Sequence, residues 1–86
     1  MGKNILMLAR YKKTEALRMA SGLTLLDDAV HVLILGPLDE QDAEVQLQLE
    51  SLEFADVPVE RLDPGAELDR LHLAEGLATA DAVFVL

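Results

Sequence analysis

The chain has 86 residues, which is enough for one domain and too few for two, so residues 1–86 are interpreted as a single domain. Hydrophobic residues make up 51% of it, which predicts a packed core. The absence of cysteine excludes disulfides, thiol nucleophiles, persulfide carriage and thiolate metal sites. Because a core of this size is small and has no disulfide to supplement it, we expect a homo-oligomer.

The net charge of −9 is distributed unevenly. Residues 1–26 carry five bases and one acid, whereas residues 27–86 carry two bases and fifteen acids. An acidic body argues against nucleic acid or an anionic membrane as partner, because both need a continuous basic face. The apolar run Ile5–Ala9 is too short for a signal sequence or a membrane span, so we expect a cytoplasmic protein.

The first part of the chain predicts two strands with a helix between them. Ile5–Ala9 is a continuous apolar run, which is typical of a strand covered on both faces. Thr14 can cap a helix that has Glu15 in its first turn. The apolar face of this helix is expected to contain Ala16, Met19, Ala20, Leu23 and Leu26. Asp27-Asp28 then makes a turn, and Val30–Leu35 gives a second strand that stops at a Gly-Pro pair.

The next segment fits two templates. Val45–Glu50 alternates as a strand does, whereas Val45, Leu49 and Leu52 also share one helical face. We choose a helix, because acids precede the segment and a parallel crossover is needed before the next strand. Val57–Leu62 alternates and contains Pro58, which predicts a strand at a sheet edge.

The last part of the chain predicts one more helix and one more strand. A turn at Asp63-Pro64-Gly65 precedes a helix that lies within residues 66–80. Its predicted apolar face contains Leu68, Leu71, Ala74, Leu77 and Ala78. Ala82–Leu86 is apolar throughout and is interpreted as a last buried strand.

This order of elements, βαβαβαβ, predicts a three-layer α/β/α fold with a four-stranded parallel sheet. Right-handed crossovers give the strand order 3-2-1-4, with two helices on one face of the sheet and one on the other. Part of the second face and the free edge of the last strand would be exposed in a monomer. Proteins cover such surface by association.

A search for catalytic motifs excludes more than it finds. The glycines are never closer than eleven residues apart, which excludes phosphate-binding loops. No serine has a glycine two residues before it and another two residues after it, which excludes a nucleophile elbow. His31, at the start of a strand, and His72, on a helix, are interpreted as solvated residues. The acids of residues 39–69 are interpreted as solvated helix faces and caps. We therefore assign no catalytic residue, metal ligand or cofactor.

One cluster of basic residues could bind an anion instead of being plain surface charge. It lies after the first strand and at the start of a helix, where open α/β sheets bind ligands and backbone amides attract anions. We favour the simpler interpretation, in which the bases form ion pairs with the acidic remainder of the protein or with another subunit. The cluster consists of Arg10, Tyr11, Lys12, Lys13 and Thr14.

Three segments of the chain resemble DsrE-like proteins, the DsrE/DsrF/DsrH and TusB/TusC/TusD group. They are the helical Ala16–Leu25, the strand segment Val30–Gly36 and the ending Ala80–Leu86. These are small α/β proteins that form multimers, and several relay sulfur as a cysteine persulfide. The resemblance implies the fold and a trimer or hexamer. The family's sulfur-carrying cysteine has no counterpart, and Val59–Pro64 offers no other nucleophile, so no active-site residue carries over.

Two hypotheses for the function follow. The first, which we favour, is a non-catalytic, DsrE-like oligomeric accessory or binding protein, associated with a partner in sulfur metabolism without itself carrying sulfur. The second is a small α/β enzyme, or a protein that binds an anion or a nucleotide through the loop after the first strand.

Overall fold

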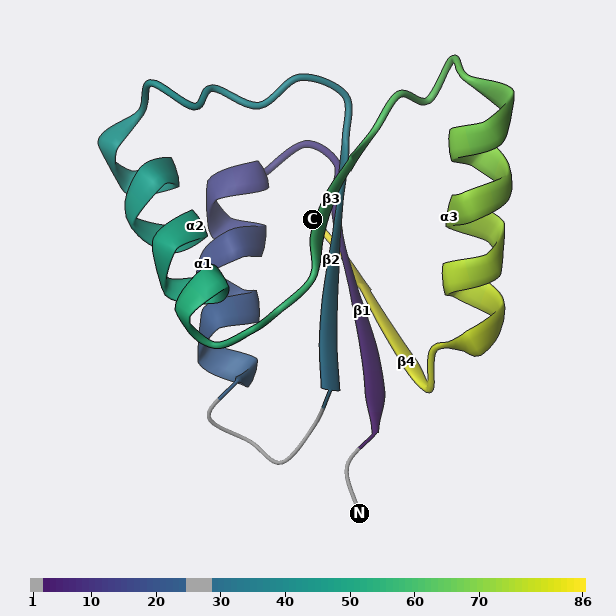
Figure 1. Cartoon of the computed structure of the whole chain (residues 1–86), viewed down its shortest axis with the longest axis horizontal. Helices are drawn as coiled ribbons and strands as arrows, with labels where there is room; N and C mark the ends of the chain where they lie inside the picture. The colour runs from purple at the N-terminus through teal and green to yellow at the C-terminus, as the bar shows by residue number, and fades with distance from the viewer. Residues whose placement is uncertain (1–2, 25–28) are drawn as a thin grey trace.

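The computed structural model describes residues 3–24 and 29–86. Four strands and three helices alternate along these residues and form three layers (Figure 1). The elements are β1 (Asn4–Ala9), α1 (Lys13–Leu23), β2 (Ala29–Leu35), α2 (Ala43–Phe54), β3 (Val59–Leu62), α3 (Glu67–Thr79) and β4 (Ala82–Val85). The sheet is parallel throughout with the order β3-β2-β1-β4, so the predicted fold class and strand order are confirmed.

Strand β1 lies in the middle of this sheet and is its most buried element. Every residue from Ile5 to Ala9 is buried, as the continuous apolar run predicts. Met7 packs with the cluster that includes α1 and α2, whereas Leu6 and Leu8 pack on the opposite face, beside α3. The first strand therefore supplies both halves of the core.

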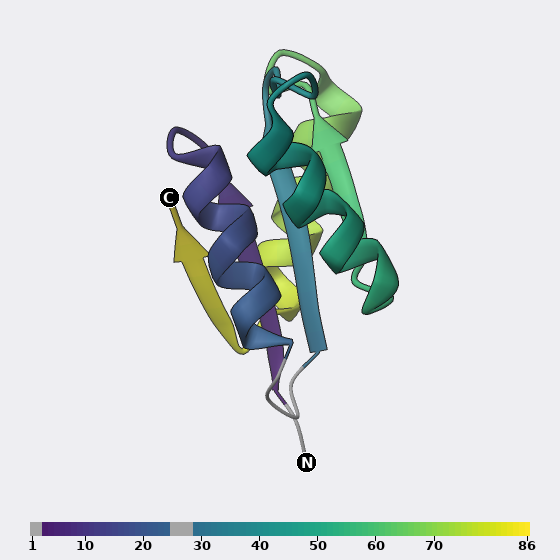
Figure 2. The ribbon, with the colours of Figure 1, turned by 90° about the vertical axis from the view of Figure 1, so that its left-hand side faces the viewer.

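Helices α1 and α2 lie side by side over one face of the sheet (Figure 2). The buried face of α1 consists of Ala16, Leu17 and Ala20. Met19 was predicted to be on this face, but 42% of its surface is exposed, so that prediction is wrong. The helix has no side-chain cap: Lys12 occupies the N-cap position and Thr14 lies inside the first turn, which corrects the predicted capping role of Thr14. The predictions for Leu26, Asp27 and Asp28 fall outside the described residues.

The ambiguous segment is a helix, as predicted. Asp42 caps α2 by accepting hydrogen bonds from the backbone amides of Glu44 and Val45. Val45 and Leu52 are buried and Leu49 is partly buried, so the predicted helical face is confirmed. Strand β3 lies at the edge of the sheet, also as predicted, although it starts only at Val59, after the proline.

Helix α2 ends in a left-handed turn that the sequence does not predict. The amide of Val57 donates to the carbonyl of Leu52, the amide of Asp56 donates to that of Glu53, and Asp56 has φ of 59°. This is the Schellman arrangement, in which glycine normally occupies the left-handed position because it has no Cβ. Asp56 therefore holds a strained backbone conformation at the entry to β3.

We expect Asp56→Gly to stabilise the protein by about 1 kcal/mol, because it removes the Cβ from the left-handed position. Chemical denaturation of both proteins would measure the difference in free energy of unfolding. Asp63→Gly, which changes an exposed aspartate at a residue without a positive φ, is the control and should not stabilise. A decrease in stability of Asp56→Gly would contradict the strain argument.

Helix α3 alone covers the other face of the sheet (Figure 1) and has no buried residue. The leucines predicted to form its apolar face, Leu68, Leu71 and Leu77, are exposed, so that face is predicted wrongly. Leu73 packs against the sheet instead. Gly76 faces the sheet as well: an added Cβ would lie 3.5 Å from Leu33 and 3.6 Å from Leu6, which are ordinary van der Waals distances.

Strand β4 pairs with β1 along one edge, and in the described chain no strand pairs with its other edge. Val83, Phe84 and Val85 are 39%, 40% and 52% exposed, so the prediction of a buried last strand is wrong for this chain alone. The expectation that its free edge is exposed is confirmed. The physical reason is that β4 packs mainly against β1, and neither α1 on one face nor α3 on the other extends over it.

The two helices of the other face are joined by a polar contact. The Nη2 atom of Arg18 on α1 lies 2.7 Å from Oε1 of Glu44 on α2, and Gln48 also donates to that carboxylate. These hydrogen bonds, that of Arg18 first, hold the pKa of Glu44 below its ordinary 4.5. Any stability that the pair contributes is thus present above pH 4.5 and is lost as the pH falls through the lowered pKa.

We expect Arg18→Gln to raise the pKa of Glu44 toward its ordinary value, because the main donor to the carboxylate loses its charge. An NMR titration of the Glu44 side-chain carboxyl would show this shift. Arg70→Gln removes a charge from an exposed residue on α3 and should leave the titration unchanged. Equal titration curves for wild type and Arg18→Gln would contradict the assigned cause.

Candidate functional site

The loop singled out from the sequence lies where β1 ends, at the carboxyl edge of the sheet. The backbone amides of Arg10 and Tyr11 both donate to the carbonyl of Leu86, at 2.6 and 2.9 Å. The loop is thereby tied to the end of β4, and the order of the sheet reverses between β1 and β4. Open α/β sheets bind ligands at such a point of reversal.

The side chains of this loop point to two different places. The Nζ atom of Lys13 donates to the carbonyl of Pro37, so this ammonium group bridges to the loop after β2. The guanidinium of Arg10 lies 5.0 Å from the centre of the Tyr11 ring, a cation–π contact on an exposed aromatic. Lys12 is exposed. The structure thus brings Arg10 and Tyr11 together and separates Lys13 from them.

The bases of this loop have no acidic partner among residues 3–24 and 29–86. The two arginine–carboxylate ion pairs of these residues are made by Arg18 and Arg61 with acids on or before α2. Arg10, Lys12 and Lys13 form none there, so the interpretation that they pair with the acidic remainder is not supported by the acids that the structure describes. Arg10 retains its capacity to bind an anion from outside the chain.

A hollow of about 500 Å³ lies beside Arg10 and Tyr11, on the α3 side of the sheet. Its walls are apolar and come from the carboxyl ends of strands and from α3. Arg10 carries the one charge among the residues that line it. The aliphatic and proline residues of the lining are Leu8, Leu35, Pro64, Leu73 and Val85.

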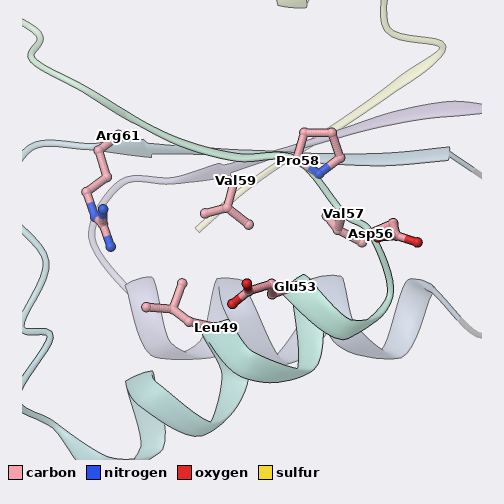
Figure 3. A pocket seen from close by; sticks show the side chains of 7 residues that line it. All are labelled: Leu49, Glu53, Asp56, Val57, Pro58, Val59 and Arg61. Carbon is pink, nitrogen blue, oxygen red and sulfur yellow. The ribbon is translucent and has the colours of Figure 1, made fainter.

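A second hollow, of about 530 Å³, lies between α2 and β3, at the far edge of the sheet. Figure 3 shows Leu49 and Val59 pointing toward each other across it, with the carboxylate of Glu53 between the helix and the strand. Arg61 also lines it, but its guanidinium is held by Glu40. This hollow lies on the amino side of β3, away from the point where the order of the sheet reverses, so we do not assign the site to it.

The structure also joins three residues that the sequence analysis treated as solvated. Oε1 of Glu60 lies 3.2 Å from Nε2 of His31, and Oε2 lies 2.6 Å from Nε2 of His72. The carboxylate on β3 therefore bridges a histidine on β2 and one on α3. Both histidines are partly exposed, as their interpretation as solvated residues implies, but the sequence analysis did not predict their contact with Glu60. The alternation of β3 carries the only sequence signal, because it places Glu60 on the opposite face from Val59 and Arg61.

These contacts connect helix α3, which has no buried residue, to strands β2 and β3 of the sheet. The side chains of the three residues are each about 40% exposed, so each contact contributes less than about 1 kcal/mol. Among the described residues, no group of three or more histidine, aspartate or glutamate side chains could hold a metal ion. We therefore interpret the cluster of His31, Glu60 and His72 as a structural contact that holds α3 to the sheet.

We expect Glu60→Gln to loosen α3, because the amide keeps the size of the side chain but loses the charge that both imidazoles contact. Hydrogen exchange of the α3 amides at a fixed neutral pH should quicken by up to about fivefold, the equivalent of 1 kcal/mol. Glu75→Gln, on an exposed position of α3 itself, is the matched control. The same exchange rates in both variants would show that Glu60 does not hold the helix.

No known family, curated protein or solved structure matches this chain. In the part of the chain that the structure describes, no helix is long and apolar enough to cross a membrane. The function must therefore be argued from the site and the surface.

Proposed function

We propose that the protein is a non-catalytic, DsrE-like subunit that acts as an oligomeric accessory or binding protein. The observation that carries this proposal is the apolar strand β4 at the open edge of the sheet. Val83, Phe84 and Val85 are exposed there, and no charge or proline interrupts Ala82–Leu86. An uncharged, apolar edge strand pairs readily with another chain.

The adjacent surface supports association as well. Leu68, Leu71 and Leu77 of α3 are exposed, on the side of the sheet that has only one helix. Large apolar side chains exposed on a small domain are surface that another subunit can cover. The resemblance to DsrE-like proteins favours a trimer or a hexamer.

The non-catalytic part of the proposal depends on the chemistry of the side chains. Sulfur transfer needs a thiolate, and the sequence contains no cysteine. The resemblance implies that the family's cysteine would fall in the region Val59–Pro64, which offers no other nucleophile. A role in sulfur metabolism would therefore consist of binding a partner protein in the cytoplasm.

We expect the wild type to be an oligomer at micromolar concentration and Phe84→Asp to dissociate it, because a charge at the β4 edge opposes burial. Light scattering after gel filtration would measure both masses. Phe54→Asp is the matched control: Phe54 is 92% exposed at the end of α2, near the opposite edge of the sheet, and its substitution should leave the mass unchanged.

Circular dichroism of each variant separates dissociation from unfolding, and Val83→Lys provides a second variant on the other face of β4. A folded wild-type monomer at micromolar concentration would contradict the proposed association. So would an oligomer that both β4 variants leave intact.

A second candidate function is the binding of an anion by the loop Arg10–Thr14. One observation favours it: Arg10, without an acidic partner in residues 3–24 and 29–86, lies at a hollow beside the point where the order of the sheet reverses. This function does not exclude the first, because a subunit of an oligomer can also bind a ligand.

A further inference from the structure

The hollow beside Arg10 differs from a phosphate site in the groups that it offers. The amides of Arg10 and Tyr11, which could cradle a phosphate, are both used by the carbonyl of Leu86. The ammonium of Lys13 is used by the carbonyl of Pro37. Of the loop's residues, Arg10 and Tyr11 line the hollow, so the polar side-chain groups that they contribute are one guanidinium and one hydroxyl. One guanidinium matches an anion with a single negative charge better than a multiply charged phosphate.

The rest of the hollow favours an apolar body on the same ligand. Leu8, Leu35, Leu73 and Val85 form aliphatic walls around a volume of about 500 Å³, within the range of small-molecule sites. Leu8 is buried at the end of the central strand and Leu73 packs against the sheet from α3, so the walls belong to rigid elements. A ligand with an alkyl or aryl chain would remove this apolar surface from water.

We propose that this hollow binds an amphipathic carboxylate, with its apolar chain between the aliphatic walls and its carboxylate on the guanidinium of Arg10. A planar guanidinium can bind a carboxylate through two parallel hydrogen bonds. Tyr11, stacked against the guanidinium, limits the orientations that the arginine side chain adopts. The proposal rests on the second candidate function, the anion-binding loop, and names the class of ligand that the loop accepts.

Tyr11 supplies a local signal for the test. It is the only tyrosine and the chain has no tryptophan, so emission excited near 280 nm comes from Tyr11, which lines the hollow. The titrants are octanoate, 1-octanol, inorganic phosphate and AMP at low ionic strength. Octanoate should change the emission saturably, 1-octanol should bind about tenfold more weakly, and phosphate and AMP should have no effect at the same concentrations.

Two variants test the role of the charge. Arg10→Gln should weaken octanoate binding about tenfold and leave 1-octanol binding unchanged, because only the carboxylate uses the guanidinium. Lys12→Gln is the matched control, since this base is exposed in the same loop and does not line the hollow. It should bind octanoate as the wild type does. Amide NMR shifts at Tyr11 and Val85 would place the ligand independently of fluorescence.

The outcomes separate this inference from the function on which it rests. Binding of phosphate or AMP without octanoate would overturn the ligand class and keep the anion-binding loop. No response to any anion would overturn both. Equal octanoate affinities of wild type, Arg10→Gln and Lys12→Gln would also overturn the inference, because the charge on Arg10 would then have no part in binding.

Discussion

The burial of β1 on both faces is the constraint on which the rest of the structure depends. A strand whose side chains are all apolar can be stable in water only with a layer on each side of it and a strand at each edge. Parallel neighbours need helical crossovers, and these crossovers supply the two layers. The end of β1 therefore emerges between β2 and β4, which places the residues that follow it at the reversal of the strand order. The position of the candidate site is a consequence of the burial of Ile5–Ala9.

The sequence was informative where a residue's environment is set by its own element. The apolar runs of β1 and β2 and the acids before α2 led to the correct elements and to the correct strand order. It was misleading where the environment is set by a close approach between elements. On α3 the leucines suggested the buried face, yet Leu68, Leu71 and Leu77 are exposed, and the helix places Leu73 and Gly76 against the sheet.

The site was predictable only in part for the same reason. Its location follows from the topology and could be predicted from the sequence. The separation of Lys13 from Arg10 could not. Lys13 contacts Pro37, a residue 24 positions away, and this contact exists only because β1 and β2 are neighbours. The bridge from Glu60 to His31 and His72 likewise joins residues of three elements. Pattern analysis detects neighbours along one element, and both of these contacts cross between elements.

The two proposed roles share strand β4. In the register of β4 with β1, Phe84 pairs with Met7, which packs toward α1, and Val85 pairs with Leu8, which packs toward α3. A subunit along the edge of β4 would contact Phe84 on one face and Val83 and Val85 on the other, and Val85 also lines the hollow. Both roles therefore act on a strand of four residues that is held along one edge. Any effect of association on ligand affinity must therefore be matched by an equal effect of the ligand on association, since the two binding free energies are linked.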